Sequence, residues 1–167
     1  INFNFESGDI ISFVGRSGSG KSTMLSLISC ILKPKKGNYY INSRNLYKDN
    51  NFAQKYISFI SQDAYLISGT IYENIIWDQK PNLAKALKLF KEIDSINLLG
   101  TLKNGLNTRV GEGGVNLSSG QSQLISIARA IYKDSEIFIL DEATNALDKK
   151  TEAKIFKKIK EISTNKI

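Results

Sequence analysis

Histidine is absent from the 167 residues, and cysteine occurs once, at Cys30. Histidine is the commonest general base and a common metal ligand, so any acid–base chemistry in this sequence falls to carboxylates. A single cysteine excludes a disulfide within the chain. Because Cys30 lies in the apolar run "MLSLISCIL", we expect it to be a small buried residue of a helix rather than a nucleophile.

Long hydrophobic runs are also missing, since "MLSLISCIL" falls well short of the roughly eighteen apolar residues of a membrane span. An apolar fraction of 41% in 167 residues suits one globular domain. The formal charge of +7 comes largely from "KPKK" and the lysines between Lys149 and Lys166, which we interpret as solvated surface rather than a nucleic-acid or membrane patch. The start at Ile1 and a helical pattern reaching almost to Ile167 lead us to expect a piece of a longer polypeptide, truncated at both ends.

Strand-like apolar runs alternate along the chain with amphipathic helical patterns. Strands are predicted over residues 10–15, 38–42, 55–62 and 136–143, and helices over 21–32, 83–93 and 149–162. A further helix is predicted after Ser118. The helix over 83–93 is expected to place Leu83, Leu87 and Phe90 on one face. This alternation predicts an α/β domain with a mostly parallel sheet.

A glycine-rich segment, "GRSGSGKST", fits the pattern G-x-x-x-x-G-K-[ST] between the first predicted strand and helix. Its glycines let successive N–H groups turn toward phosphate oxygens, Lys21 can reach the β- and γ-phosphates, and the Ser22 hydroxyl can ligate Mg²⁺. An ordinary Gly/Ser-rich turn is the alternative. The predicted phosphate site comprises Gly15, Arg16, Ser17, Gly18, Ser19, Gly20, Lys21, Ser22 and Thr23.

Two carboxylates follow the apolar strand pattern "IFIL", at Asp141 and Glu142. Ligand contacts in an open α/β sheet lie at the carboxyl ends of strands, so Asp141 is suitably placed to hold Mg²⁺. Neighbouring residues on a strand point opposite ways, so the two acids should not share one task. In a chain without histidine, Glu142 is the natural candidate to polarise an attacking water. The alternative is two solvated acids at a strand end.

The segment "NLSSGQSQ" supports two interpretations. Ser118 and Gln121 fit the capping box S-x-x-Q, in which side chains merely satisfy the first N–H groups of a helix. The same free N–H groups, with the positive end of the helix dipole, also suit an anion.

The order of these motifs resembles that of the ATP-binding cassette (ABC) ATPases, whose signature is usually Leu-Ser-Gly-Gly-Gln. The resemblance covers essentially the whole chain and implies a P-loop NTPase core with a small antiparallel β part and an inserted helical subdomain. It implies that residues 1–65 and 133–167 form the core and 66–132 the helical subdomain. It also implies binding of ATP and Mg²⁺, with Lys21, Gln62 and Glu142 catalytic, and Ser22, Gln62 and Asp141 near the metal. Asp148, in "NALD", would belong to the D-loop.

In that family two cassettes face head to tail, so the second anion site would serve the partner's ATP. Ser118, Ser119, Gly120 and Gln121 would then contact the γ-phosphate held by the other copy. Ser119 departs from the usual glycine, and it could narrow the approach of the phosphate or add a hydroxyl donor. The family also implies a switch histidine and an adenine-stacking aromatic, which would lie beyond residues 1–167. We therefore expect the 167 residues alone to bind ATP poorly and hydrolyse it slowly.

Two further stretches, Leu66 to Ile75 and Thr108 to Gly114, are similar to segments of exporters that fuse membrane helices and cassette in one chain. This resemblance implies an exporter domain at the cytoplasmic face of a membrane, with Glu112 in the loop that touches the membrane domain. Tyr72 and Trp77 are interpreted as aromatic packing. The alternative is a soluble ABC ATPase acting on DNA or ribosomes, although we do not expect nucleic acid as a partner. A small-molecule kinase would leave "LSSGQ" unexplained.

Overall fold

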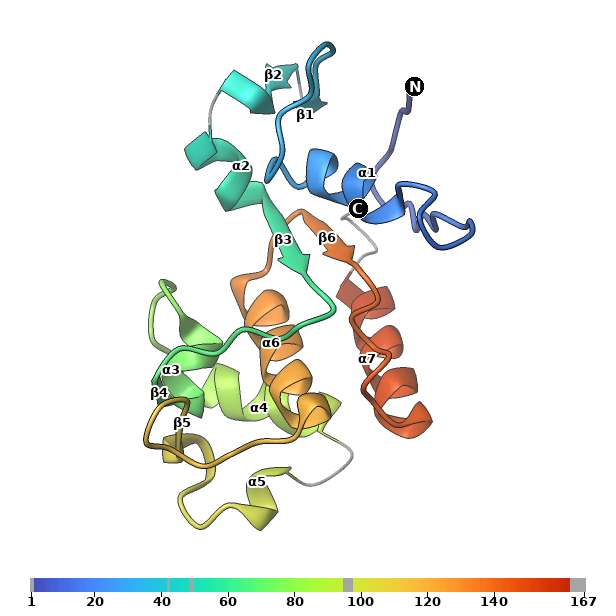
Figure 1. Cartoon of the computed structure of the whole chain (residues 1–167). Coiled ribbons are helices and arrows are strands. Elements are labelled where there is room, and N and C mark those ends of the chain that lie inside the picture. The colour runs from blue at the N-terminus through green and yellow to red at the C-terminus, as the bar shows by residue number, and fades with distance from the viewer. Residues whose placement is uncertain (1, 42, 49, 95–97, 163–167) are drawn as a thin grey trace.

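A short parallel pair of strands lies between two groups of helices in the computed structural model, which describes residues 2–41, 43–48, 50–94 and 98–162 (Figure 1). β3 (Ile57–Ile60) and β6 (Ile137–Leu140) pair in register, from Ile57 opposite Ile137 to Ile60 opposite Leu140. Three of the four β3 residues are buried, as is usual for parallel strands covered on both faces. The parallel pair between helices confirms the predicted α/β class.

Before β3 the chain forms a small antiparallel part. α1 (Lys21–Ile28) is followed by β1 (Tyr40–Ile41), which pairs with β2 (Arg44–Asn45), and then by the 3-10 turn η1 (Leu46–Lys48) and α2 (Asn50–Tyr56). Leu46 and Ala53 pack with Ile57, Ile137 and Ile139 into a small core beside the parallel strands. The predicted strands over 38–42 and 55–62 are therefore present in shortened form. Asn42 lies outside the described residues.

The segment between β3 and β6 is mainly helical. It contains β4 (Gly69–Thr70), α3 (Ile71–Ile76), α4 (Leu83–Ile93), α5 (Leu98–Thr101), η2 (Gly105–Asn107), β5 (Arg109–Val110) and α6 (Ser119–Lys133). α6 runs through the middle of the main core and contributes Leu124, Ile127, Ala128 and Ile131 to it. The helix predicted after Ser118 is confirmed.

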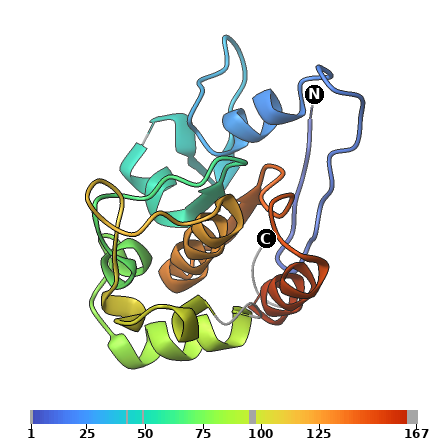
Figure 2. The ribbon, with the colours of Figure 1, turned by 60° about the horizontal axis from the view of Figure 1, so that its bottom comes forward.

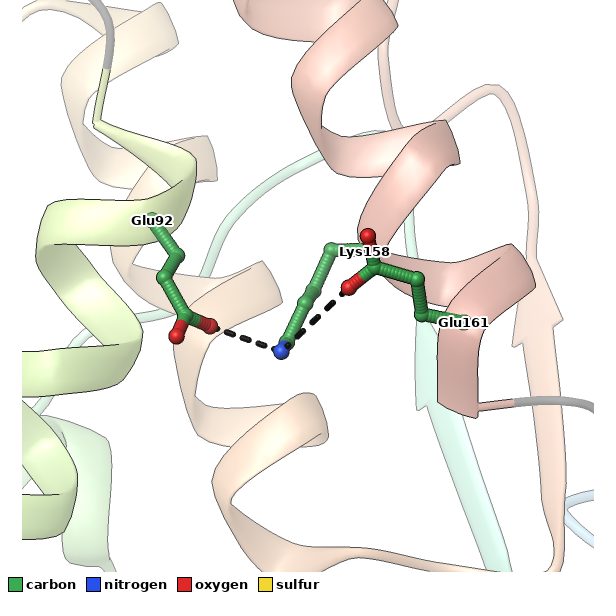
Figure 3. A network of polar contacts seen from close by, with 3 residues as sticks. All are labelled: Glu92, Lys158 and Glu161. Atoms are coloured by element: carbon green, nitrogen blue, oxygen red, sulfur yellow. Dashed lines mark ion pairs between the residues drawn. The ribbon is translucent and has the colours of Figure 1, made fainter.

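Helix α7 (Lys149–Ile162) closes the main core on the side opposite α3 (Figure 1). Ile155 is fully buried, and Ile159 and Ile162 pack on the same cluster. The Lys158 Nζ atom lies 2.7 Å from Glu92 Oε2 on α4 and 3.7 Å from Glu161 Oε2 on α7 (Figure 3). The ion pair with Glu92 raises the pKa of Lys158, mainly through its hydrogen bond. Lys166, in the lysine-rich end, is outside the described range.

The strand predicted over residues 10–15 is wrong, because this segment has irregular backbone and pairs with no strand in the described part of the chain. Apolar β-branched composition favours a strand only where a neighbouring strand supplies the ladder. Here Phe13 instead meets Phe3 edge to face, with ring centroids 5.8 Å apart. Ile10 and Val14 are 70% and 93% exposed. Figure 2 shows this blue segment running down toward the red helix α7.

Two details of the helical predictions also need correction. α1 ends at Ile28 rather than residue 32, and Cys30 is half-buried beyond its end with φ 60°. A residue in this left-handed conformation cannot continue an α-helix. On α4 the buried face is Ala86, Leu89, Phe90 and Ile93, whereas Leu83 is 51% exposed because it lies in the first turn, beyond the edge of the core.

Within the stretches that the structure describes, none of the helices combines the length and the apolar character that crossing a membrane requires.

Candidate active site

The glycine-rich segment forms an irregular loop that leads into the start of α1. Gly18 and Gly20 have φ values of 78° and 90°, a left-handed conformation that glycine adopts without steric cost. The Lys21 Nζ atom donates hydrogen bonds to the carbonyl oxygens of Gly15 (3.0 Å) and Arg16 (3.1 Å). The ammonium group is thus held over the loop it follows.

The Ser22 hydroxyl meets Asp141 from the far end of the sequence. Ser22 Oγ donates to Asp141 Oδ1 at 3.2 Å, and the Asp141 N–H donates to the Ile60 carbonyl at 2.9 Å. The second bond extends the β3–β6 ladder by one residue, so it fixes Asp141 at the carboxyl edge of the parallel pair. A hydroxyl and a carboxylate are hard oxygen ligands of the kind that Mg²⁺ prefers. The donor set therefore fits the predicted metal.

Glu142 has a different hydrogen-bond partner from Asp141. Its φ is 51°, which is uncommon for a residue with a side chain and tends to occur at functional sites. Its Oε2 accepts a hydrogen bond of 3.0 Å from the Asn145 side-chain amide. Lys21, Asp141 and Glu142 all line one cavity of about 410 Å³, whose other walls include Phe13 and Phe156.

Gln62 lies two residues beyond the end of β3, at the same sheet edge as Asp141, and its side chain is exposed. The loop around it contains an internal hydrogen bond of 2.7 Å from the Ser61 hydroxyl to the Asp63 carbonyl. The structure therefore brings Lys21, Ser22 and Asp141 together and leaves Gln62 exposed.

The head of α6 has the predicted capping box. Ser118 Oγ accepts from the Gln121 N–H at 3.3 Å, and the Ser118 N–H donates to Gln121 Oε1 at 2.9 Å. Ser118 and Ser119 are exposed. A Cβ atom on Gly120 would lie 2.6 Å from the Ala146 carbonyl oxygen, so glycine allows this helix start to approach the 145–148 segment. Sequence reasoning missed this structural role of Gly120.

Asp148 caps the next helix, α7. Its Oδ1 accepts from the N–H groups of Lys150 (2.9 Å) and Thr151 (3.0 Å), and its Oδ2 accepts from the Thr151 hydroxyl. These hydrogen bonds lower the pKa of Asp148, that from the Thr151 hydroxyl most. The observed role of Asp148 is to begin α7, and the predicted contact with nucleotide stays a prediction.

The two stretches likened to exporters lie side by side. β4 pairs antiparallel with β5, Gly69 opposite Val110 and Thr70 opposite Arg109. The Glu112 N–H donates to Ser68 Oγ at 3.1 Å, and the Glu112 side chain is exposed.

Arg129 and Asn74 were missed by the sequence analysis. Arg129 donates to the carbonyl oxygens of Asn74 (2.7 Å) and Tyr65 (3.0 Å) and to Asn74 Oδ1 (2.9 Å). Its guanidinium carbon lies 4.5 Å from the centre of the Trp77 ring, which stays 45% exposed. Tyr72 packs on the main core as predicted. Burial lowers the pKa of Arg129. The available signal was one arginine within the apolar run "IARAI".

Comparisons with known proteins agree with this geometry. Residues 1–145 match the family model described as "ABC transporter". The chain is 36% identical over 168 residues to a putative export ATP-binding/permease protein of Rickettsia bellii, and 38% identical over 172 residues to an ATP-dependent lipid A-core flippase of Blochmanniella floridana. The alignments cover 100% and 99% of the chain but 29% of each relative. A solved bacterial Atm1-family ABC exporter with ATP bound superposes with a TM-score of 0.82 and 29% identity, covering 90% of this chain and 27% of that one.

The chain belongs to the ABC transporter family. The predictions of an ABC-type ATP-binding domain and of ATP as its nucleotide are confirmed at the level of the family. The exporter relatives support the prediction of an exporter domain. Their names give no support to the alternative, an ATPase that acts on DNA or ribosomes. The chain spans about three tenths of the length of these relatives.

Proposed function

We propose that this chain is the ATP-hydrolysing part of an ABC exporter and works at the cytoplasmic face of a membrane. The observation that carries the proposal is the 3.2 Å contact between the Ser22 hydroxyl and the Asp141 carboxylate. This contact joins the proposed phosphate loop to the edge of the parallel strands, although the two residues are 119 positions apart in the sequence. Lys21 and Glu142 line one cavity. The exporter relatives support the assignment to transport.

Gly15 to Thr23 would surround the phosphates, and the Lys21 ammonium would leave the Gly15 and Arg16 carbonyls to bind the β- and γ-phosphates. Ser22 and Asp141, with Gln62 nearby, would hold Mg²⁺. When bound, Mg²⁺ would neutralise charge on the phosphate oxygens. The work of these residues is positioning and charge stabilisation rather than covalent chemistry.

Glu142 would act as the general base for the attacking water. Glu142 is exposed and lines the cavity, and the Asn145 side-chain amide donates a hydrogen bond to its carboxylate. Asp141 is engaged with Ser22, so the two acids can serve different tasks. The proton of the water would pass to a Glu142 carboxylate oxygen.

A second cassette would complete the site. The exposed Ser118 and Ser119, with Gly120 and Gln121, would close over ATP held by the loop Gly15 to Thr23 of the other copy, as the N-terminus of α6 favours negative charge. Closure would be passed to membrane helices of the same polypeptide through two loops, the one around Gln62 (residues 61–65) and the one around Glu112. In this scheme residues 1–65 and 133–167 act as the ATPase core and 66–132 as the helical subdomain.

The test uses Glu142→Gln in the full-length protein. Loss of a general base is expected to lower ATP turnover by about 10² to 10⁴-fold, while ATP binding is kept. The variant should also accumulate as an ATP-bound pair of cassettes, which light scattering detects as a doubled mass.

The matched control is Glu136→Gln, an exposed acid at the opposite end of β6, which should leave turnover unchanged. Turnover of Glu142→Gln within about twofold of wild type would contradict the role of Glu142. A mass that stays monomeric at saturating Mg-ATP would contradict the paired arrangement.

A further inference from the structure

Helix α6 holds one end of the Gln62 loop through a buried glutamine. Gln123, in the second turn of α6, is only 1% exposed. Its Nε2 atom donates to the carbonyl oxygen of Ser61 at 3.0 Å. Ser61 is the residue immediately before Gln62, so this bond fixes the entry of the loop.

The same helix holds the other end of the loop through Arg129. Arg129 Nη1 donates to the carbonyl oxygen of Tyr65 at 3.0 Å. Arg129 is itself anchored by its bonds to the Asn74 carbonyl and side chain. The exit of the loop is therefore attached to a side chain that cannot swing freely.

Gln62, Asp63 and Ala64 lie between these two attachments. Gln123 and Arg129 are six residues apart on one helix, or about 9 Å along its axis. The start of that helix is the capped segment Ser118 to Gln121. One helix thus carries Ser118 to Gln121, here called the signature segment, and also Gln123 and Arg129, the two residues that hold the Gln62 loop.

We propose that Gln123 and Arg129 are positioning residues that fix Gln62 relative to the signature segment, so that the two move as one unit. The inference rests on the proposed function, which gives Gln62 a role at the nucleotide. Because Gln62 is exposed, the position of its side chain depends on the position of its backbone. Displacement of a catalytic group by about 1 Å can cost roughly a hundredfold in rate. Hydrogen bonds from buried donors are strong because the local dielectric is low.

The central variant is Gln123→Met in the full-length protein, because methionine keeps the length and volume but donates no hydrogen bond. We expect kcat for ATP hydrolysis to fall by about ten- to a hundredfold with little change in KM. Amide hydrogen exchange of residues 62–65 should become faster. The matched control is Tyr132→Phe on the same helix, which deletes a bond of 2.8 Å to the Lys80 carbonyl, away from the loop, and should change neither quantity.

Two further measurements separate positioning from stability alone. In a Gln62→Ala background, adding Gln123→Met should lower kcat no further, since the group it positions is gone. If Gln123→Met does not fold, Arg129→Lys gives the same test, because lysine keeps the charge but not the forked geometry. It should lower kcat and speed exchange at 62–65.

The outcomes separate the two ideas. If Gln62→Ala lowers kcat but Gln123→Met leaves kcat and loop exchange at wild-type values, the positioning inference is overturned and the proposed function stands. An additive loss of kcat in the double variant would overturn it too. If neither Gln62→Ala nor Glu142→Gln lowers turnover, the proposed function fails, and the inference fails with it.

Discussion

Asn74, near the end of the stretch Leu66 to Ile75, is a sensitive point of the structure. Its side chain is fully buried and takes part in four hydrogen bonds. Its Oδ1 accepts from the Ile67 N–H and from Arg129 Nη2, both at 2.9 Å. Its Nδ2 donates to the carbonyl oxygens of Ile67 (2.9 Å) and Thr70 (3.0 Å). One amide thus organises the turn before α3 and its contact with α6.

We expect Asn74→Ala to destabilise the chain by about 4 kcal/mol, since four bonds are lost at about 1 kcal/mol each. Water entering the space left by the amide would reduce this value, and buried groups left without a partner would increase it. Because a domain of this size has a total stability of about 5–15 kcal/mol, the variant would lose a large part of it.

Urea unfolding of the 167-residue chain measures this loss. With a slope of about 2 kcal/mol/M, the midpoint should fall by about 2 M. The matched control is Asn116→Ala, an exposed asparagine in the loop before α6, which should shift stability by less than about 0.5 kcal/mol. A midpoint for Asn74→Ala equal to that of Asn116→Ala would refute the reasoning.

Two other substitutions test contacts between distant segments. Gly120→Ala should cost about 1–3 kcal/mol in urea unfolding, because the new Cβ would lie 2.6 Å from the Ala146 carbonyl oxygen and force the backbone to shift; an unchanged midpoint would contradict that close approach. Lys158→Met should cost less than about 1 kcal/mol, as the pair with Glu92 is partly exposed. Since its folded pKa is raised, the contribution of Lys158 should be present below the ordinary lysine pKa of 10.5 and lost as pH rises through the folded value. The difference between wild type and variant should therefore vanish at high pH, and one that persists there would contradict the ion pair.

Local sequence patterns predicted those helices and loops whose characteristic residues all lie within the helix or loop itself. The helices over 83–93 and 149–162 were placed at their observed bounds, because a 3.6-residue apolar period marks the buried stripe. The irregular glycine-rich loop before Lys21 and the capping box of Ser118 were predictable for the same reason, since each depends on residues next to one another in the chain.

Features that depend on distant partners could not be predicted in this way. Residues 10–15 have strand composition, but their state depends on whether a neighbour supplies a ladder. The Gln123 bond to Ser61 spans 62 positions and the Arg129 bond to Tyr65 spans 64, so no local period reveals them. The proximity of Ser22 and Asp141 was expected for another reason. Ligand contacts in an α/β protein lie at the carboxyl ends of its parallel strands, and both residues were predicted to lie near the same metal ion.

The conformation of Cys30 has a practical consequence for spectroscopy. It is the chain's one thiol, so replacing it leaves a background in which a cysteine at an exposed position outside the proposed site, such as Lys88, carries a single fluorophore or spin label. The usual exchange for alanine or serine would put another Cβ-bearing residue at φ 60°. Glycine, and to a lesser degree asparagine, tolerates that backbone. Cys30→Gly is therefore the background in which to attach reporters for following the cassette in real time.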